Sequence, residues 1–295
     1  MGMRVATFAA SDRLLQAALK VQAKQAEATL QQASGQISDN YGGLGNKAGS
    51  VVSLQSSVSM SKSYAEAANT ASTRVEAMYD AVDSIIDQIT SMKGTLSSFS
   101  ATSSGTDELQ VTAEEMLESL ASLMNTQLGG RYLFAGSAVD RPPVDLDSLA
   151  SATSPSSSDT GYYQGDDAVT SVKVSSEQTV SYGFTADNEN FEKALRALSL
   201  VASGATDSDA LTEASGLLDE AISGLATVQT RLSLNASALK TAISDQENYQ
   251  DFAGDLATSL SGVDVAVVAA RMSAYETQLQ AAYAAVVPDL RGLTL

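Results

Sequence analysis

Residues 64–96 read YAEAANTASTRVEAMYDAVDSIIDQITSMKGTL. Within this stretch, apolar residues recur at alternating steps of 4 and 3, at Tyr64, Ala68, Ala71, Val75, Met78, Val82, Ile85, Ile89, Met92 and Leu96. A repeat of about 3.5 residues is the heptad pattern of helices that pack along a shared seam. The stretch therefore predicts a long helix and, in addition, a partner helix around which it supercoils.

Four further stretches carry helical periodicity. We expect a first helix over about residues 11–38 with Ser11 as its N-cap, a third helix over about 109–127, and helices resuming from about residue 190. The first helix gathers Leu15, Leu19, Gln22, Ala26, Leu30, Ala33 and Ile37 on one face. The last helix has a seam at Val265, Val268, Met272, Tyr275, Leu279, Ala282 and Val286, and Pro288 is expected to end it.

The middle of the chain, from residue 129 to about 190, has a different pattern. Three of the four prolines fall here, together with a serine-rich stretch over 151–158. Residues 172–174 and 179–182 have the composition of short strands. Residues 137–190 hold two basic and nine acidic side chains, a net charge of −7, whereas residues 1–38 have a net charge of +2. The middle is therefore expected to face solvent.

These patterns predict a mainly α fold, in which an elongated antiparallel helical, coiled-coil stem is built from both ends of the chain and carries a small β-containing inserted domain. The expected divisions are residues 1–60 (N-terminal helix and break), 61–136 (first half of the stem), 137–190 (β-rich outer domain), 191–250 (second half of the stem) and 251–295 (C-terminal helix).

Composition excludes several classes of function. The chain has no Cys and no His, so disulfides, thiol nucleophiles, histidine bases and the usual zinc sites are ruled out, and no cofactor is expected. A formal net charge of −18 without a basic patch argues against nucleic-acid binding. No stretch is apolar enough for membrane insertion, and the first ten residues do not resemble a cleavable secretory signal.

The carboxylates do not form a recognisable catalytic set. Glu114 and Glu115 are neighbours on a helix and point about 100° apart, so they do not converge on one substrate. Asp166 and Asp167 follow Gly165 and indicate a turn. Asp145 and Asp147 lack the other ligands of a calcium loop. A carboxylate-based hydrolase remains the least favoured interpretation, and the chain is not expected to be an enzyme.

The apolar seams of the two terminal helices need a cover. They can cover each other within one chain, or equivalent helices of neighbouring subunits can cover them. Repeated head-to-tail use of one surface generates an open helical array. Periodicity alone leaves both possibilities open.

Three stretches resemble the bacterial flagellin superfamily, which includes filament flagellin and the hook–filament junction protein. The first is Arg4-Val5-Ala6-Thr7-Phe8 with the glutamine-rich helix that follows, up to Ser34-Gly35. The second and most specific is Gly130-Arg131-Tyr132-Leu133-Phe134-Ala135-Gly136, a stretch typical of the junction protein at the entry to its outer domain. The third runs from Val263-Asp264-Val265-Ala266 into Gln278-Leu279-Gln280-Ala281-Ala282-Tyr283. The chain departs from the family pattern after Ser34-Gly35 and at Pro288.

The resemblance implies a structural subunit of the flagellar filament or of its junction with the hook, extracellular and exported by a type III route without a cleavable signal. It implies that the subunit binds copies of itself, other flagellar axial proteins or both, and that it binds an export chaperone. It also implies terminal helices that are disordered in the monomer and pair as concentric layers on assembly. The expected polymerisation interface is Leu15, Leu19, Ala26, Leu30, Ile37, Val265, Val268, Met272, Tyr275, Leu279, Ala282 and Val286. The alternative is a non-flagellar secreted coiled-coil protein of secretion or adhesion.

Overall fold

The structure, a computed structural model, describes the backbone of residues 2–99 and 105–291 and the side chains of residues 12–99 and 105–285. Helices dominate these residues, and the strands are two or three residues long. The elements in chain order are α1 (Gly2–Ser34), the 3₁₀ helix η1 (Tyr41–Lys47), α2 (Ala48–Ser98), α3 (Gly105–Met124), β1 (Gln127–Leu128), β2 (Arg131–Tyr132), η2 (Leu146–Ser148), β3 (Ser171–Lys173), β4 (Thr179–Ser181), α4 (Glu189–Ala202), α5 (Ser208–Ser261) and α6 (Val265–Arg291). The predicted mainly α fold with a small β insertion is confirmed.

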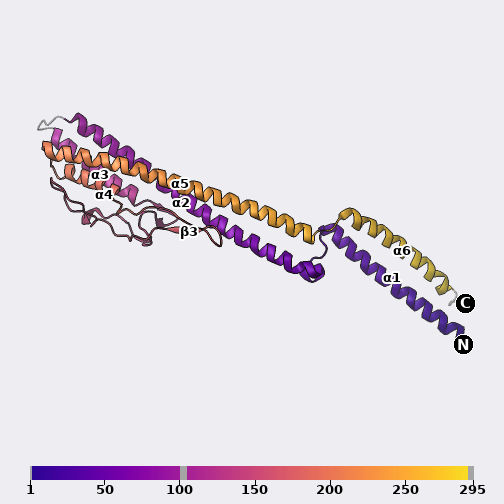
Figure 1. Ribbon diagram of the computed structural model, residues 1–295. Coiled ribbons are helices and arrows are strands. Elements are labelled where there is room, and N and C mark those ends of the chain that lie inside the picture. Colours follow the sequence, from indigo (N-terminus) through magenta and orange to yellow (C-terminus); the bar gives the residue numbers. More distant parts are fainter. Residues whose placement is uncertain (1, 100–104, 292–295) are drawn as a thin grey trace. The chain divides into compact units, whose positions relative to one another are not determined.

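The partner that the heptad stretch requires is α5, which runs beside α2 in the opposite direction (Figure 1). Near the start of α2, the Ser61 hydroxyl donates to the Gln246 carbonyl at 3.0 Å. Farther along, Gln229 Nε2 donates to Asp83 at 2.7 Å, and Lys93 forms an ion pair with Asp219. As the residue numbers rise along α2, the numbers of their partners on α5 fall, so the two helices are antiparallel.

The heptad seam forms the core, as predicted. Nine of its ten residues, all except Tyr64, are buried: Ala68, Ala71, Val75, Met78, Val82, Ile85, Ile89, Met92 and Leu96. They pack in one cluster with Leu218, Leu225, Leu232 and Leu239 of α5 and with apolar residues of α3 and α4. Burial of each large aliphatic side chain is worth about 1.5–3 kcal/mol, so this cluster is the main source of stability.

The strands form two small antiparallel hairpins. β1 pairs with β2 across Gly129 and Gly130, whose φ angles of +61° and +75° favour glycine. β3 pairs with β4, with Val172 opposite Val180. The second hairpin confirms the strands predicted over 172–174 and 179–182, whereas the first was not predicted because two-residue strands carry no readable periodicity.

The chain divides into two compact units. A central unit contains residues 61–248, and a terminal unit contains residues 1–60 together with 249–295. Within the terminal unit, α1 and α6 lie side by side and antiparallel (Figure 1). Both α2 and α5 contribute residues to each unit.

Three predicted helix ends differ from the structure. Ser11 is not an N-cap, because α1 has already begun at Gly2 and the alanines before Ser11 favour helix. α1 ends at Ser34 and not at residue 38, since Gly35 has a φ of +69°. The prediction that Pro288 ends the last helix is wrong, because α6 continues to Arg291; a proline this close to the end removes only one backbone donor.

Candidate functional site

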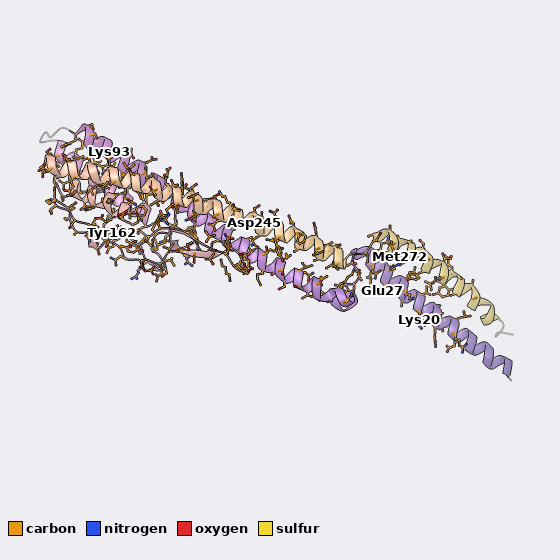
Figure 2. All side chains as sticks on the ribbon, viewed as in Figure 1. Lys20, Glu27, Lys93, Tyr162, Asp245 and Met272 are labelled. Carbon is orange, nitrogen blue, oxygen red and sulfur yellow. The ribbon has the colours of Figure 1, made fainter. Side chains whose placement is uncertain are left out.

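The contact between α1 and α6 uses alanines on α1 and larger side chains on α6. Ala18 and Ala28 are buried on α1, with Val21 half-buried between them. On α6, Val268 and Leu279 are buried, and Met272 and Tyr275 are half-buried. Figure 2 labels Met272 on this helix. The two helices therefore cover each other along one seam within a single chain.

The face of α1 named in the sequence analysis is not the face that contacts α6. Leu15, Leu19 and Leu30 are 50%, 57% and 67% exposed, and Ala26 is also exposed. Ile37 lies beyond the helix and is half-buried. Three leucines on one helix thus remain exposed to solvent, although leucine side chains are usually buried.

The corresponding residues of α6 have a different placement. Val268 and Leu279 are buried, whereas Met272, Tyr275 and Ala282 are half-buried. Val265, at the start of the helix, is 47% exposed. The side chain of Val286 lies outside the described residues. The seam of α6 is thus largely occupied by α1 of the same chain.

Backbone hydrogen bonds fix the register of α1 against α6 at the point where each helix begins or ends. The Ile37 N–H donates to the Ser261 carbonyl at 2.7 Å, and the Val263 N–H donates to the Gly35 carbonyl at 2.9 Å. Gln31 Nε2 also donates to the Ile37 carbonyl at 2.9 Å. The left-handed conformation of Gly35, with φ +69°, turns the chain out of α1 and into this pairing.

A second exposed apolar surface lies at the end of α5 in the terminal unit. Tyr249, Phe252 and Leu256 are 42%, 65% and 40% exposed at steps of 3 and 4 along the helix. Ala253 and Ala257 are buried on the adjacent face. This stripe was not predicted from the sequence. The apolar residues at steps of 3 and 4 from Tyr249 to Leu256 could have shown it, and they lie one position before the register of the buried Ala253 and Ala257.

The domain-entry motif forms a turn that is anchored in the core. Leu133, Phe134 and Ala135 are buried, and the Phe134 ring packs edge-on against Phe191 at 5.7 Å between centroids. Tyr132 is half-buried, and Gly130 and Arg131 are exposed. The motif closes at Gly136, with φ +69°, where an added Cβ would collide with the backbone of Asp166. Only glycine fits there.

Asp166 closes this turn from 29 residues farther along the chain. Its carboxylate accepts hydrogen bonds from the Ser137 hydroxyl, the Ser137 N–H and the Ala168 N–H, while its own N–H donates to the Ala135 carbonyl. The hydrogen bond from the Ser137 hydroxyl, followed by those from the two N–H groups, holds the pKa of Asp166 below its ordinary value. The turn residues identified from Gly165 thus have a structural role.

Two further carboxylates, on α4 and α5, also have structural roles. Glu213 on α5 accepts hydrogen bonds from the hydroxyls of Ser154 and Ser156 and from the Ser156 N–H, which lower its pKa. Buried Glu192 accepts from the Asp159 N–H at 3.0 Å and pairs with Arg196. These contacts attach the serine-rich stretch to α4 and α5.

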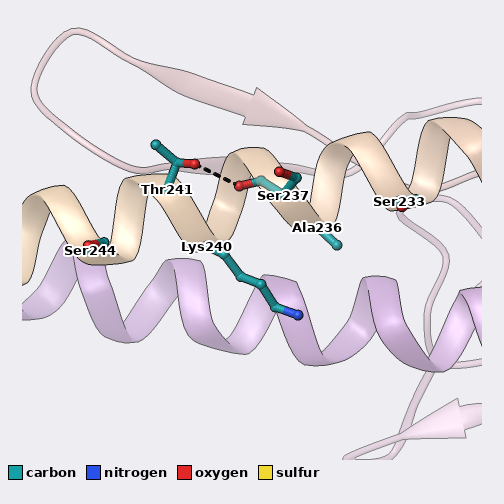
Figure 3. Close-up of a pocket in the computed structure, with 6 residues that line it drawn as sticks. All are labelled: Ser233, Ala236, Ser237, Lys240, Thr241 and Ser244. Carbon is teal, nitrogen blue, oxygen red and sulfur yellow. Dashed lines mark hydrogen bonds between the residues drawn. The ribbon is translucent and has the colours of Figure 1, made fainter.

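A groove of about 490 Å³ on α5 is lined by side chains that do not form a recognisable catalytic set. It is lined by Ser233, Ala236, Ser237, Lys240, Thr241 and Ser244 (Figure 3). Its single titratable side chain, Lys240, forms an ion pair with Glu76 at 2.9 Å. Among the described residues, no three acidic side chains gather in a way that could hold a metal ion. Within the same part of the chain, no helix is both long and apolar enough to cross a membrane.

Comparison with known protein families gives a match for the C-terminal helices of this chain. Residues 215–288, which cover most of α5 and α6, match the family described as the bacterial flagellin C-terminal helical region. The chain carries a flagellin-type C-terminal region. The resemblance stated from the sequence is confirmed.

Two solved structures share the fold. A Vibrio parahaemolyticus protein assigned as flagellar hook-associated has a TM-score of 0.63 and 16% identity, over 76% of this chain and 99% of its own. Flagellar hook-associated protein 3 of Legionella pneumophila has a TM-score of 0.56 and 12% identity, over 70% of this chain and 98% of its own. No curated protein sequence matches the chain. The family match over residues 215–288 supports a structural role in the flagellum, and the two solved structures show a shared fold.

Proposed function

We propose that the protein is a structural subunit of the bacterial flagellum that assembles through its terminal helices into the filament or its junction with the hook. The observation that carries the proposal is the row of exposed leucines on α1, in the same unit as the flagellin-type α6. Burying one such leucine against a neighbour is worth about 1.5–3 kcal/mol, so three provide a strong drive to associate.

The distribution of charge supports assembly through the terminal unit. That unit contains seven basic and eight acidic residues, a net charge of −1, whereas the central unit contains ten basic and 27 acidic residues, a net charge of −17. Like charges oppose close approach of central units, and a nearly neutral surface does not. The subunit is thus extracellular in this proposal, and its partners are copies of itself or other flagellar axial proteins. An export chaperone would cover the leucines before assembly.

The test uses a charge placed on the exposed row. Leu19→Asp should leave the melting temperature of the monomer nearly unchanged, because a surface substitution alters stability by at most about 0.5 kcal/mol. The same change should prevent polymer formation, measured by sedimentation and negative-stain microscopy. Leu279→Asp is the buried counterpart, and it should disrupt the α1–α6 pair in the monomer, because it places an unpaired charge in an apolar seam. Normal polymers of Leu19→Asp would refute the assembly role of this face.

Between filament and junction, we propose the junction. The support is the Gly130–Gly136 entry, which resembles the junction protein, and the fold that the chain shares with two hook-associated proteins. A strain lacking the gene should retain hooks and release unpolymerised flagellin into the medium, as measured by immunoblot of the culture supernatant. If sheared filaments of the parent strain consist mainly of this chain, the chain is the filament subunit.

A further inference from the structure

The two terminal helices differ in the size of the side chains on their faces. On α1, the face against α6 carries the buried Ala18 and Ala28 with the half-buried Leu14, Val21 and Gln25. The exposed face carries Leu15, Leu19 and Leu30. Leu19 directly follows Ala18, so the two faces lie about 100° apart around the helix. We call the exposed set the leucine face.

The distribution on α6 is the reverse. Its face against α1 carries Val268, Met272, Tyr275 and Leu279. An adjacent exposed face carries alanines at Ala270, Ala274, Ala281 and Ala285, together with Val267 and Gln278. Ala274 directly precedes Tyr275, so this alanine face also lies about 100° from the seam, in the opposite direction along the sequence. The residues named for the two faces are uncharged, and the charged side chains next to them are Asp12, one turn before Leu15, and Arg271, one turn after Val267.

Within one chain, therefore, the most buried side chains that α1 turns toward α6 are alanines, and those that α6 turns toward α1 are larger. Three leucines remain exposed on α1, and a row of alanines remains exposed on α6, where Val265, Val267 and Tyr283 are exposed as well. We propose that the leucine face of α1 in one copy packs on the alanine face of α6 in a second copy. This inference rests on the proposed assembly function and specifies which surfaces meet. The leucines would act as knobs that enter the holes left between alanines, as they do between paired helices generally.

The geometry of the pair favours an open array. The helices are antiparallel. A step of one residue forward along α1 and a step of one residue backward along α6 therefore turn in the same sense around their helix axes, when both helices are viewed from the same end. The leucine face and the alanine face therefore lie on opposite sides of the two-helix layer. A second copy can stack on each side through the same heterologous contact, and such a contact extends as an open array when the rotation between copies does not close a ring.

The absence of cysteine from the chain provides a direct test. Full-length Leu19→Cys would be mixed with full-length Ala270→Cys, Ala274→Cys or Ala281→Cys, the variants assembled together and then oxidised. Each chain carries one thiol, so every disulfide joins two chains, and mass spectrometry identifies which. Adducts between Leu19→Cys and at least one α6 variant should exceed both homodimers several-fold.

Matched controls use exposed positions away from both faces, Ala17→Cys on α1 and Gln280→Cys on α6. A control pair that cross-links as efficiently as the proposed pair, or a majority of Leu19→Cys homodimers in assembled material, would overturn the inference and leave the assembly function standing. If the unmodified chain forms no polymer, alone or on isolated hooks, both proposals fail.

A size exchange provides a second measurement. Leu19→Ala should raise the critical concentration for assembly roughly tenfold, the equivalent of about 1.4 kcal/mol. Leu19→Ala combined with Ala274→Leu, Ala270→Leu or Ala281→Leu in one chain should recover at least part of the loss in the variant that restores the contact. Failure of every combination to improve on Leu19→Ala, together with a negative cross-linking result, would place the leucine face against some other surface.

Discussion

Asp166 shows how a single residue can connect segments that are distant in sequence. Its carboxylate receives three hydrogen bonds, two of them from Ser137, and Tyr163 donates its hydroxyl to the Asp166 carbonyl at 2.6 Å. The turn at Gly136 is therefore held by both the side chain and the backbone of Asp166. Because this turn follows the buried Phe134, the position of Asp166 determines the direction of the chain where residues 137–190 begin.

Replacing this carboxylate should reduce the stability of the central unit. Asp166→Asn removes the charge that strengthens the bonds from Ser137 and Ala168, so we expect a lower melting temperature at pH 7. The folded-state pKa is below the ordinary value, so the stabilisation is present above about pH 4 and is lost as pH falls through the folded-state pKa. The difference from the unmodified protein should therefore shrink at pH 3.

The neighbouring carboxylate is the control for that measurement. Asp167 is exposed, and Asp167→Asn should leave the melting temperature close to that of the unmodified protein at both pH values. Thermal unfolding followed by circular dichroism at pH 7 and pH 3 would compare the three proteins. Equal effects of the two substitutions would show that the bonds to Ser137 do not stabilise the turn.

At the scale of elements, the register of α1 and α6 depends on one glycine in a left-handed conformation. Gly35→Ala meets no atom within 4 Å, so the cost comes from its φ of +69° and should be about 1–2 kcal/mol. Gly254→Ala within α5 also meets no atom, and it should stabilise that helix by up to about 1 kcal/mol. Thermal melts should therefore shift in opposite directions, and a shared direction would contradict this assignment of strain.

The sequence predicted some elements better than others for physical reasons. The α2 seam could be read because nearly all its large apolar residues face one core. α1 was harder, since its buried face is marked by Ala18 and Ala28, whereas its most visible residues, Leu15, Leu19 and Leu30, are the exposed ones. Periodicity shows that a face is apolar and does not show which neighbour covers it. The Asp166 contact was out of reach, because loops carry no such period.

At the scale of the whole molecule, the main property is the separation of charge from exposed apolar surface. The central unit carries a net charge of −17, and the terminal unit, with a net charge of −1, carries both the leucine face and the stripe at Tyr249, Phe252 and Leu256. Sequence alone gave the acidic middle, but assigning the charge to units required the fold.

This separation predicts how assembly responds to salt. The opposing charges lie on central units, and the Debye length falls from about 30 Å at 0.01 M to about 10 Å at 0.1 M salt. Raising sodium chloride over this range should lower the critical concentration, because repulsion is screened while apolar contact is retained. Sedimentation at several salt concentrations would measure it. A critical concentration that rises with salt would show instead that ion pairs drive the contact.

The two backbone bonds that join Gly35 and Ile37 to Val263 and Ser261 also restrict how such chains can change length. α1 extends 33 residues and α6 extends 27 residues from this shared point. An insertion of seven residues in α1 alone would add two turns with no partner on α6, whereas matched insertions in both would keep every seam position covered. The serine-rich stretch over 151–158 is bonded to Glu213 through Ser154 and Ser156, but it has no paired helix whose length it must match. Homologous chains should therefore vary more in the length of the segment that corresponds to residues 137–190. Insertions and deletions in the two terminal helices should occur together.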